Sequence, residues 1–339
     1  MAKPTLALIP SAQGSKFYSV LPSNGVGDFD FTRSGSATRI NSQGLIETVA
    51  SGVSRLNYPL IDGVVKGCPS HLLEPTRQNL VTYNNDLTNA NWTTGNISKV
   101  ANDTISPNGT LDASKVIATV NNDSHYFQQQ FNIGENNVTI SAYVKNIDAN
   151  YIQVTNAGNA LAFTNFDIQN GTGVQCELGE FETSVIPTTT ASVTRSAETA
   201  SGAGDASTFN DSEGVLMVEI SALADDGTTR QIDLSYLGTN TDYVRLEFAA
   251  TSNLIYGVVK NTSQQAALSY TLPDSTDSNK IAIKYKANDF ALWVNGFEVD
   301  TDPSGTTPSN LNDLSMQSTL SANPFYGNTK QIQYFDSAL

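Results

Sequence analysis

The stretch ALWVNGFEV, residues 291–299, gives the clearest indication of how this chain folds. Its central pair, Asn295-Gly296, joins two arms with alternating apolar side chains. Asn-Gly suits a two-residue β-hairpin turn, because both positions of that turn take left-handed backbone angles. The stretch therefore predicts a β-hairpin near the end of the chain.

Other runs around this hairpin have the same short, β-like pattern, at 214–223, 230–238, 243–251, 254–260, 280–288 and 330–336. Turn-forming residues separate the runs, and helical periodicity longer than about two turns is absent after residue 80. Short strands at such regular intervals are typical of an antiparallel sandwich. We therefore predict a β-sandwich over residues 199–339.

An earlier region, residues 81–187, carries a second set of such runs. In VTISAYVKN (138–146) the residues Val138, Ile140, Ala142 and Val144 point one way, which is the pattern of a half-buried strand. Turn clusters such as SPNGT (106–110) separate the runs, and LDASKVIATV favours a strand because it is rich in β-branched residues. This region is predicted to be a sandwich or jelly roll.

The segment between the two regions is rich in Thr and Ser but also contains apolar residues. We interpret FETSVIP (181–187) as the last strand of the jelly roll, and residues 188–198 as the crossing to the second sandwich. β-Branched residues such as Val193 and Thr194 stiffen the backbone. An ordered, extended connector is therefore expected, in contrast to a flexible tether.

Residues 1–80 have little periodicity and many Gly and Ser interruptions. Pro75 cannot continue a helix, and a segment of this length builds only a small core by itself. We expect an arm that neighbouring domains or subunits hold in place. The predicted fold class is all-β: an extended irregular N-terminal arm followed by two antiparallel β-sandwich (jelly-roll) domains.

Composition excludes several classes of function. Eighteen basic and 33 acidic residues give a formal charge of −15, which disfavours nucleic acid as a partner. No stretch approaches the ~20 apolar residues of a membrane helix, and the first residues do not resemble a signal peptide, so no membrane insertion is expected. Cys68 and Cys176 leave a disulfide open, although two separate buried thiols are the commoner arrangement.

The sequence offers no recognisable catalytic set. Glycoside hydrolysis needs two carboxylates across the scissile bond, whereas Glu219, Glu247 and Asp233 each stand alone in a different run. The two histidines, His71 and His125, are interpreted as packed or surface residues. We predict that the chain is not an enzyme, with convergence of acids from separate strands as the open alternative.

Two kinds of ligand site are considered. Loop acids Asp225, Asp226, Asp300 and Asp302 carry the oxygen donors that Ca²⁺ prefers, but they also suit ordinary turns, and the turn interpretation is favoured, so no cofactor is predicted. Exposed aromatic rings could stack on sugar faces, although aromatic residues within strands more often belong to a core. The glycan-binding candidates are Trp92, Tyr126, Tyr151, Trp293 and Tyr326.

Arginines are concentrated in the arm and the connector of a chain that has few cations. A guanidinium can hold carbonyl groups or a carboxylate with several donors at once. We expect clamps between subunits or domains, with Glu47 and Glu74 as acidic partners. The arginine candidates are Arg33, Arg39, Arg55, Arg77 and Arg195.

Several motifs resemble structural appendage proteins of tailed bacteriophages, the tail- and head-fibre family. FTRSGSATRINSQGLIETV (31–49) and HLLEPTRQNLVTYNNDLTNANW (71–92) resemble their arm. ISPNGTLDASKV (105–116), FDIQNGT (166–172) and LGEFETSVIPTTTASVTRSAE (178–198) resemble a carbohydrate-binding-module-like jelly roll. KIAIKYKANDFALWVNG (280–296) is similar to a concanavalin-A-like, laminin-G-type domain.

The resemblance implies a bacteriophage virion structural protein. Its arm would attach a head or tail fibre subunit, commonly a homotrimer, to other capsid or tail proteins. Its lectin-like sandwiches would serve host adhesion by carbohydrate binding to surface polysaccharide. The alternatives are a virion-associated glycan depolymerase and a free bacterial lectin.

Overall fold

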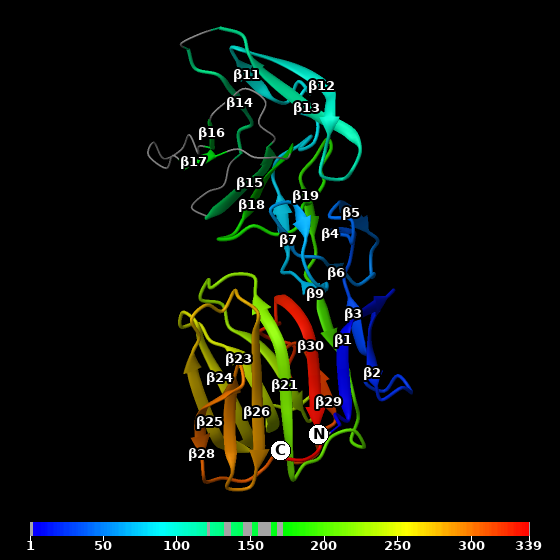
Figure 1. The fold of residues 1–339 in the computed structure, drawn as a ribbon, viewed down its shortest axis with the longest axis vertical. Helices are drawn as coiled ribbons and strands as arrows, with labels where there is room; N and C mark the ends of the chain where they lie inside the picture. Colours follow the sequence, from blue (N-terminus) through cyan, green and yellow to red (C-terminus); the bar gives the residue numbers. More distant parts are fainter. Residues whose placement is uncertain are drawn as a thin grey trace.

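A computed structural model describes residues 3–120, 123–131, 137–144, 151–154, 164–167 and 172–338. Every regular element in this part of the chain is a β-strand, and every named strand pair is antiparallel (Figure 1). The predicted all-β class is therefore confirmed. No helix in these residues is long and apolar enough to cross a membrane.

The largest sheet has 11 strands. Its order is β20 (Thr199–Ser201), β3 (Phe29–Thr32), β2 (Lys16–Leu21), β1 (Leu6–Gln13), β30 (Gly327–Phe335), β21 (Glu213–Ala222), β26 (Asn279–Lys286), β27 (Phe290–Val294) and β28 (Phe297–Asp302). Strand β9 (Ser70–Leu73) pairs with β30 and with β6 (Leu56–Asn57).

A five-stranded sheet completes the C-terminal sandwich. Its order is β25 (Ser263–Thr271), β24 (Leu254–Asn261), β23 (Asp242–Phe248), β22 (Arg230–Ser235) and β29 (Asp313–Ser315). Alternate residues of the two sheets, including Leu246 and Ile283, face one buried core. The predicted hairpin at Asn295-Gly296 is confirmed: both residues have positive φ and Val294 pairs with Phe297.

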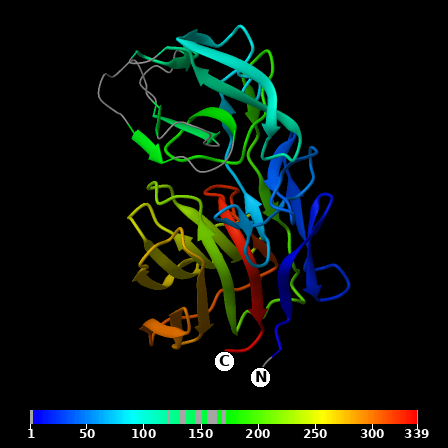
Figure 2. The same ribbon diagram turned by 45° about the horizontal axis from the view of Figure 1, so that its top comes forward.

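The N-terminal segment corrects one expectation. It is not a separate arm, because β1 pairs with β30, and Leu6, Leu8, Phe17 and Phe29 are buried in the same core as the C-terminal sandwich. In Figures 1 and 2 the blue N-terminal strands lie beside the red β30. Of the two expected supports, a neighbouring domain or a neighbouring subunit, the domain of the same chain covers these apolar residues. The segment cannot complete a sheet by itself, but the strand that pairs with β1 lies about three hundred residues later in the same chain.

A central unit, residues 77–195, lies beyond one end of the sandwich (Figure 1). It has a four-stranded sheet, β15 (Val138–Val144), β18 (Thr172–Leu178), β10 (Arg77–Asn79) and β19 (Val193–Arg195). Three two-stranded sheets accompany it: β11 (Thr93–Gly95) with β14 (Tyr126–Gln128), β12 (Ile97–Ile105) with β13 (Leu111–Ala118), and β16 (Tyr151–Val154) with β17 (Thr164–Asp167). Its core contains Val81, Leu87, Trp92 and Cys176.

Two small hairpins connect these parts, β4 (Ala37–Ile40) with β5 (Ile46–Val49), and β7 (Leu60–Ile61) with β8 (Val64–Val65). The strand predicted at 181–187 is wrong, because this stretch forms no ladder. Its backbone is held by side chains instead: Glu177 accepts from the Thr183 amide at 2.9 Å, and Gln175 accepts from the Ile186 amide at 2.7 Å.

Candidate functional site

A buried cluster of three arginines and two glutamates lies where the sandwich, the hairpins and the central unit meet. We call it the Arg–Glu junction; its members are Arg33, Arg55, Arg195, Glu74 and Glu198. Arg33, Arg55, Glu74 and Glu198 each flank a short strand and Arg195 ends β19, so four separate chain segments converge at one point. All five side chains are at most 3% exposed.

Glu198 is the centre of the junction. Its carboxylate accepts hydrogen bonds from Arg33 Nη1 at 2.7 Å, from Arg55 Nε at 2.9 Å and from the Glu74 amide at 2.9 Å. Arg55 Nη2 also contacts Glu198 Oε2. A buried carboxylate with this many donors is fully compensated for its loss of water.

Glu74 forms the second half of the junction. Its Oε2 lies 2.8 Å from Arg55 and 3.0 Å from Arg195, and its Oε1 accepts from the Ser184 amide at 2.7 Å. Burial alone raises the pKa of Glu74, but the charges of Arg55 and Arg195 lower it to about 2. Since Ser184 belongs to the irregular stretch after β18, this contact joins the central unit to β9.

The remaining clamp candidates lie outside the junction. Arg39 and Glu47 pair with each other across the β4–β5 hairpin at 2.5 Å, in a partly exposed position. Arg77 lies over the ring of Phe181, 4.6 Å from its centroid. The sequence analysis grouped four of the junction members as clamp candidates but missed Glu198. The available signal was its position, three residues after the candidate Arg195.

A cleft of about 90 Å³ lies between the β4–β5 hairpin and the central unit. One wall comes from the hairpin and the turn at 106–108, and the other from β15, β18 and the stretch around Val185. Among the residues that the structure describes, its lining is made of hydroxyl, amide and apolar side chains, without a carboxylate, amine or imidazole. The lining residues are Thr38, Ile46, Thr48, Asn84, Asn85, Ser106, Pro107, Asn108, Ser141, Tyr143, Val174, Gln175, Val185 and Pro187.

The aromatic residues proposed from the sequence do not line this cleft. Trp92 is 5% exposed, donates its ring N–H to the Tyr83 carbonyl and packs edge-on against Phe127, so it belongs to a core. Tyr126 is exposed, but its ring lies over Gly95 of the neighbouring strand.

The other three candidates are scattered. Trp293 is exposed on β27, and Tyr326 packs against the C-terminal core. Tyr151 lies in β16, and its side chain is outside the described part of the structure. The cleft instead presents Tyr143, which the sequence pattern did not distinguish from other strand aromatics.

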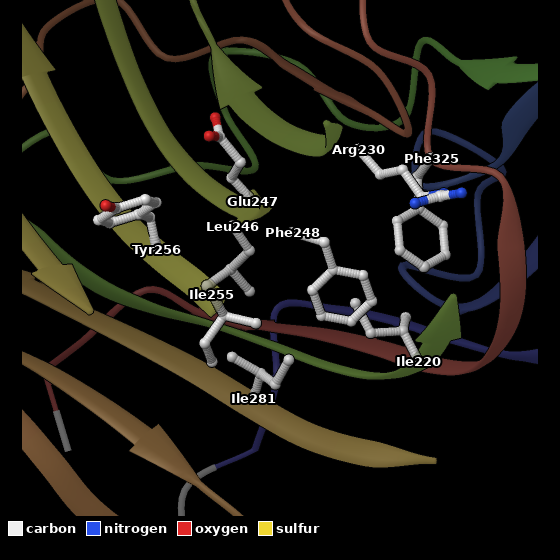
Figure 3. Close-up of a pocket in the computed structure, with 9 residues that line it drawn as sticks. All are labelled: Ile220, Arg230, Leu246, Glu247, Phe248, Ile255, Tyr256, Ile281 and Phe325. Carbon is white, nitrogen blue, oxygen red and sulfur yellow. The ribbon is translucent and has the colours of Figure 1, made fainter. Parts of the chain in front are cut away.

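A second cavity lies inside the C-terminal sandwich (Figure 3). Ile220, Phe248, Ile255 and Ile281 gather there from both sheets, while Glu247 points away from them (Figure 3). It leaves no room for a water molecule, so it is a packing gap. It offers no ligand site.

Carboxylates from different strands come close together on the outer face of the five-stranded sheet. The sequence of any one strand gives no sign of this convergence. Asp233 is fully buried, and Arg245 donates to both of its oxygens at 2.7 Å. The Thr319 amide adds a bond at 3.0 Å, and Gln231 donates to the neighbouring Glu247 at 2.5 Å. Burial raises the pKa of Asp233, but both of its oxygens already accept hydrogen bonds from Arg245. We therefore interpret Asp233 and Glu247 as parts of a structural ion-pair network.

The acids considered for Ca²⁺ accept hydrogen bonds from the protein itself, from their own turns or from neighbouring strands and loops. Asp226 also pairs with Arg230 at 2.7 Å, and Asp302 accepts from the Ser304 amide at 3.0 Å. Asp225 accepts from the Asn253 amide and Asp300 from the Ser269 amide. Within the described ranges, no group of three or more His, Cys, Asp or Glu side chains is placed to hold a metal ion.

The two cysteines are separate free thiols. Cys68 is exposed, whereas Cys176 is buried in the core of the central unit. Burial and the neighbouring Glu177 raise the pKa of the Cys176 thiol to about 11.

Comparison with protein-family models and with curated proteins gives no match. Among solved structures, the CBM40 module of the Ruminococcus gnavus IT-sialidase, bound to α2,3-sialyllactose, is 17% identical; the match covers 41% of this chain and 82% of the module, with a TM-score of 0.34. A K499G mutant of the NanB sialidase from Streptococcus pneumoniae is 13% identical, with 40% of this chain and 23% of that one covered and a TM-score of 0.33.

Sheep galectin-11 is 10% identical, with 36% of this chain and 85% of that one covered and a TM-score of 0.25. The likeness to all three is confined to the β-sandwich fold.

Proposed function

We propose that this chain is a glycan-binding structural subunit that a bacteriophage particle displays as a head or tail appendage. The observation that carries the binding part is the cleft, whose lining is uncharged and rich in hydroxyl and amide groups. Such groups exchange hydrogen bonds with sugar hydroxyls without ionising either partner.

Binding is favoured over depolymerisation on chemical grounds. Hydrolysis of a glycosidic bond requires one carboxyl as acid and a second as nucleophile or base. Neither is among the cleft-lining residues in the described ranges, and on the five-stranded sheet Asp233 accepts hydrogen bonds from Arg245 and from the Thr319 amide. The chain would therefore hold a glycan without cleaving it.

The Arg–Glu junction supports a structural role for the chain. Three cations and two anions, buried and hydrogen-bonded, fix the central unit against the sandwich. In some proteins buried ion pairs specify one arrangement of the parts that they join, and we propose this role for the junction. A subunit that presents a glycan site at a distance from its attachment point needs such a fixed geometry.

Self-association into a homotrimer would use the β7–β8 hairpin. Its residues Leu60, Ile61 and Val64 are 39%, 56% and 54% exposed, an apolar set that a second copy of this chain would cover. Charge points to the same region: residues 1–80 carry seven basic and five acidic residues, whereas 81–339 carry 11 and 28. Repulsion between copies is therefore expected to be weakest along the N-terminal segment.

Light scattering on the purified chain tests the assembly part. We expect a mass three times the 36.2 kDa of one chain. Ile61→Asp should shift it to the monomer, and Ile105→Asp, on the 64%-exposed Ile105 of β12, should not. A monomeric wild-type protein would contradict this part.

Antibody labelling of intact particles tests the location. We expect the label at a head or tail appendage, together with capsid or tail proteins in cross-linked material. An unlabelled particle would contradict the virion assignment and would leave the glycan-binding part to its own test.

A further inference from the structure

The amide group of Asn84 is the unusual feature of the cleft. Asn84 is 1% exposed, and its Oδ1 accepts from the Thr188 amide at 2.9 Å. Its own backbone amide donates to Thr188 Oγ1 at 3.2 Å, so the residue is held at both ends. Its Nδ2 is buried and makes no hydrogen bond.

An unpaired buried donor is unfavourable unless a ligand or water completes it. Because the oxygen is committed to Thr188, the NH₂ group is the part of the Asn84 side chain that remains to be paired. Gln175, in the same lining, differs: its oxygen accepts from the Ile186 amide at 2.7 Å and its nitrogen donates to the Thr183 carbonyl at 3.3 Å. Of these two amide side chains, Asn84 is therefore the one whose nitrogen is left unpaired.

We infer that the cleft binds one neutral sugar ring through the Asn84 amide, which donates to a ligand hydroxyl or ring oxygen. This inference rests on the proposed glycan-binding function and gives it a site. Thr48 on the hairpin is exposed at the rim, and Tyr143 on β15 is partly exposed and brings an aromatic ring to the opposite wall. A ring and several hydroxyls are what recognition of a pyranose requires.

Size and charge define the ligand class. About 90 Å³ is several times the roughly 15 Å³ that one water needs, yet below the range of sites that bury a large ligand. A single ring, or its hydroxyl-bearing edge, fits this space. A sialic or uronic acid would need a cation, and the described lining residues include none, while the chain as a whole has a formal charge of −15.

Ligand-observed NMR on the full chain tests the inference. The probes are methyl glycosides of galactose, glucose, mannose, fucose and N-acetylglucosamine, with N-acetylneuraminic acid and glucuronate as charged comparisons. We expect saturation transfer to at least one neutral glycoside and none to the two acids. Transfer to an acid in preference to the neutral sugars would overturn the assigned class.

Two variants locate the site. Asn84→Asp keeps the acceptor for Thr188 and removes the NH₂ group, so affinity for the neutral sugar should fall at least tenfold. Thr48→Trp fills the rim from an exposed position and should have the same effect without disturbing the fold. Ser42→Trp, at the exposed turn of the same hairpin and outside the lining, is the control and should bind as the wild type does.

Equal affinity in Thr48→Trp and Ser42→Trp would overturn the inference. If those two variants also bind host polysaccharide equally well, glycan adhesion stands and the site lies elsewhere. If the wild-type protein binds neither the glycosides nor the polysaccharide, both the proposed glycan-binding function and this site are contradicted.

Discussion

Replacing Glu198 by Gln is the most informative perturbation of this fold. The side chain keeps its shape but loses the charge that compensates Arg33 and Arg55. Both guanidinium groups are fully buried, so water cannot replace the missing charge. One substitution therefore tests whether the Arg–Glu junction joins the two parts of the chain.

The expected loss follows from burial. Removing one partner of a buried pair leaves an uncompensated charge and costs about 3–5 kcal/mol. Glu213→Gln is the matched control, because Glu213 and Lys286 form a pair at 2.8 Å whose side chains are 29% and 51% exposed. Exposed pairs contribute about 0–1 kcal/mol.

Urea unfolding measures the difference in the free energy of unfolding between the two variants. The two tryptophans report separately on the central unit and on the C-terminal sandwich. Trp92 lies in the core of the central unit and Trp293 in the C-terminal sandwich. With Trp92→Phe and Trp293→Phe backgrounds, each reporter is read alone. We expect coincident transitions in the parent chain, and an earlier Trp92 transition once Glu198→Gln is added. Equal losses for Glu198→Gln and Glu213→Gln would refute the reasoning.

Three further predictions concern the buried residues of the first eighty. Burial lowers the pKa of His71 to about 4; the Ile9 backbone beside it offsets this only in part, and neither ring nitrogen has a hydrogen-bond partner of ordinary geometry. Stability should therefore be full above pH 6.5 and fall by about 2 kcal/mol between pH 7 and pH 5, and His71→Leu should remove most of that slope in urea titrations at each pH. Glu74, whose pKa is lowered from 4.5 to about 2, should contribute up to about 3 kcal/mol above pH 4.5 that is lost as the pH falls to 2; a Glu74→Gln chain with unchanged acid sensitivity would contradict this. Phe17→Ala should cost about 3–5 kcal/mol and lower the Trp293 transition, because Phe17 is fully buried in the sandwich core and stacks on His71 at 3.9 Å; an unchanged Trp293 transition would show that the segment folds separately.

Local signals in the sequence were sufficient for some of the strands. The hairpin at Asn295-Gly296 was predictable because its turn chemistry is contained in two residues, and the strand pattern of Val138 and Ile140 because alternation needs only one strand. The pairing of β1 with β30 was not predictable in this way, since it joins Leu6 to Tyr334 and leaves no local pattern.

The candidate site was predictable only in part. Arginine enrichment pointed to the junction, but the role of Glu198 depends on three segments meeting in space. The stretch at 181–187 has the composition of a strand, yet side chains such as Gln175 take up its backbone groups and no ladder forms. The cleft depends on the position of the β4–β5 hairpin against the central unit, which no periodicity encodes.

Calorimetric titration of the intact chain with host-surface polysaccharide, with reducing ends assayed in the same samples, tests the central claim most directly. The account predicts saturable heat of binding, loss of that heat in Thr48→Trp, and no increase in reducing ends. Release of reducing ends by the wild-type chain, or no binding at all, would contradict it.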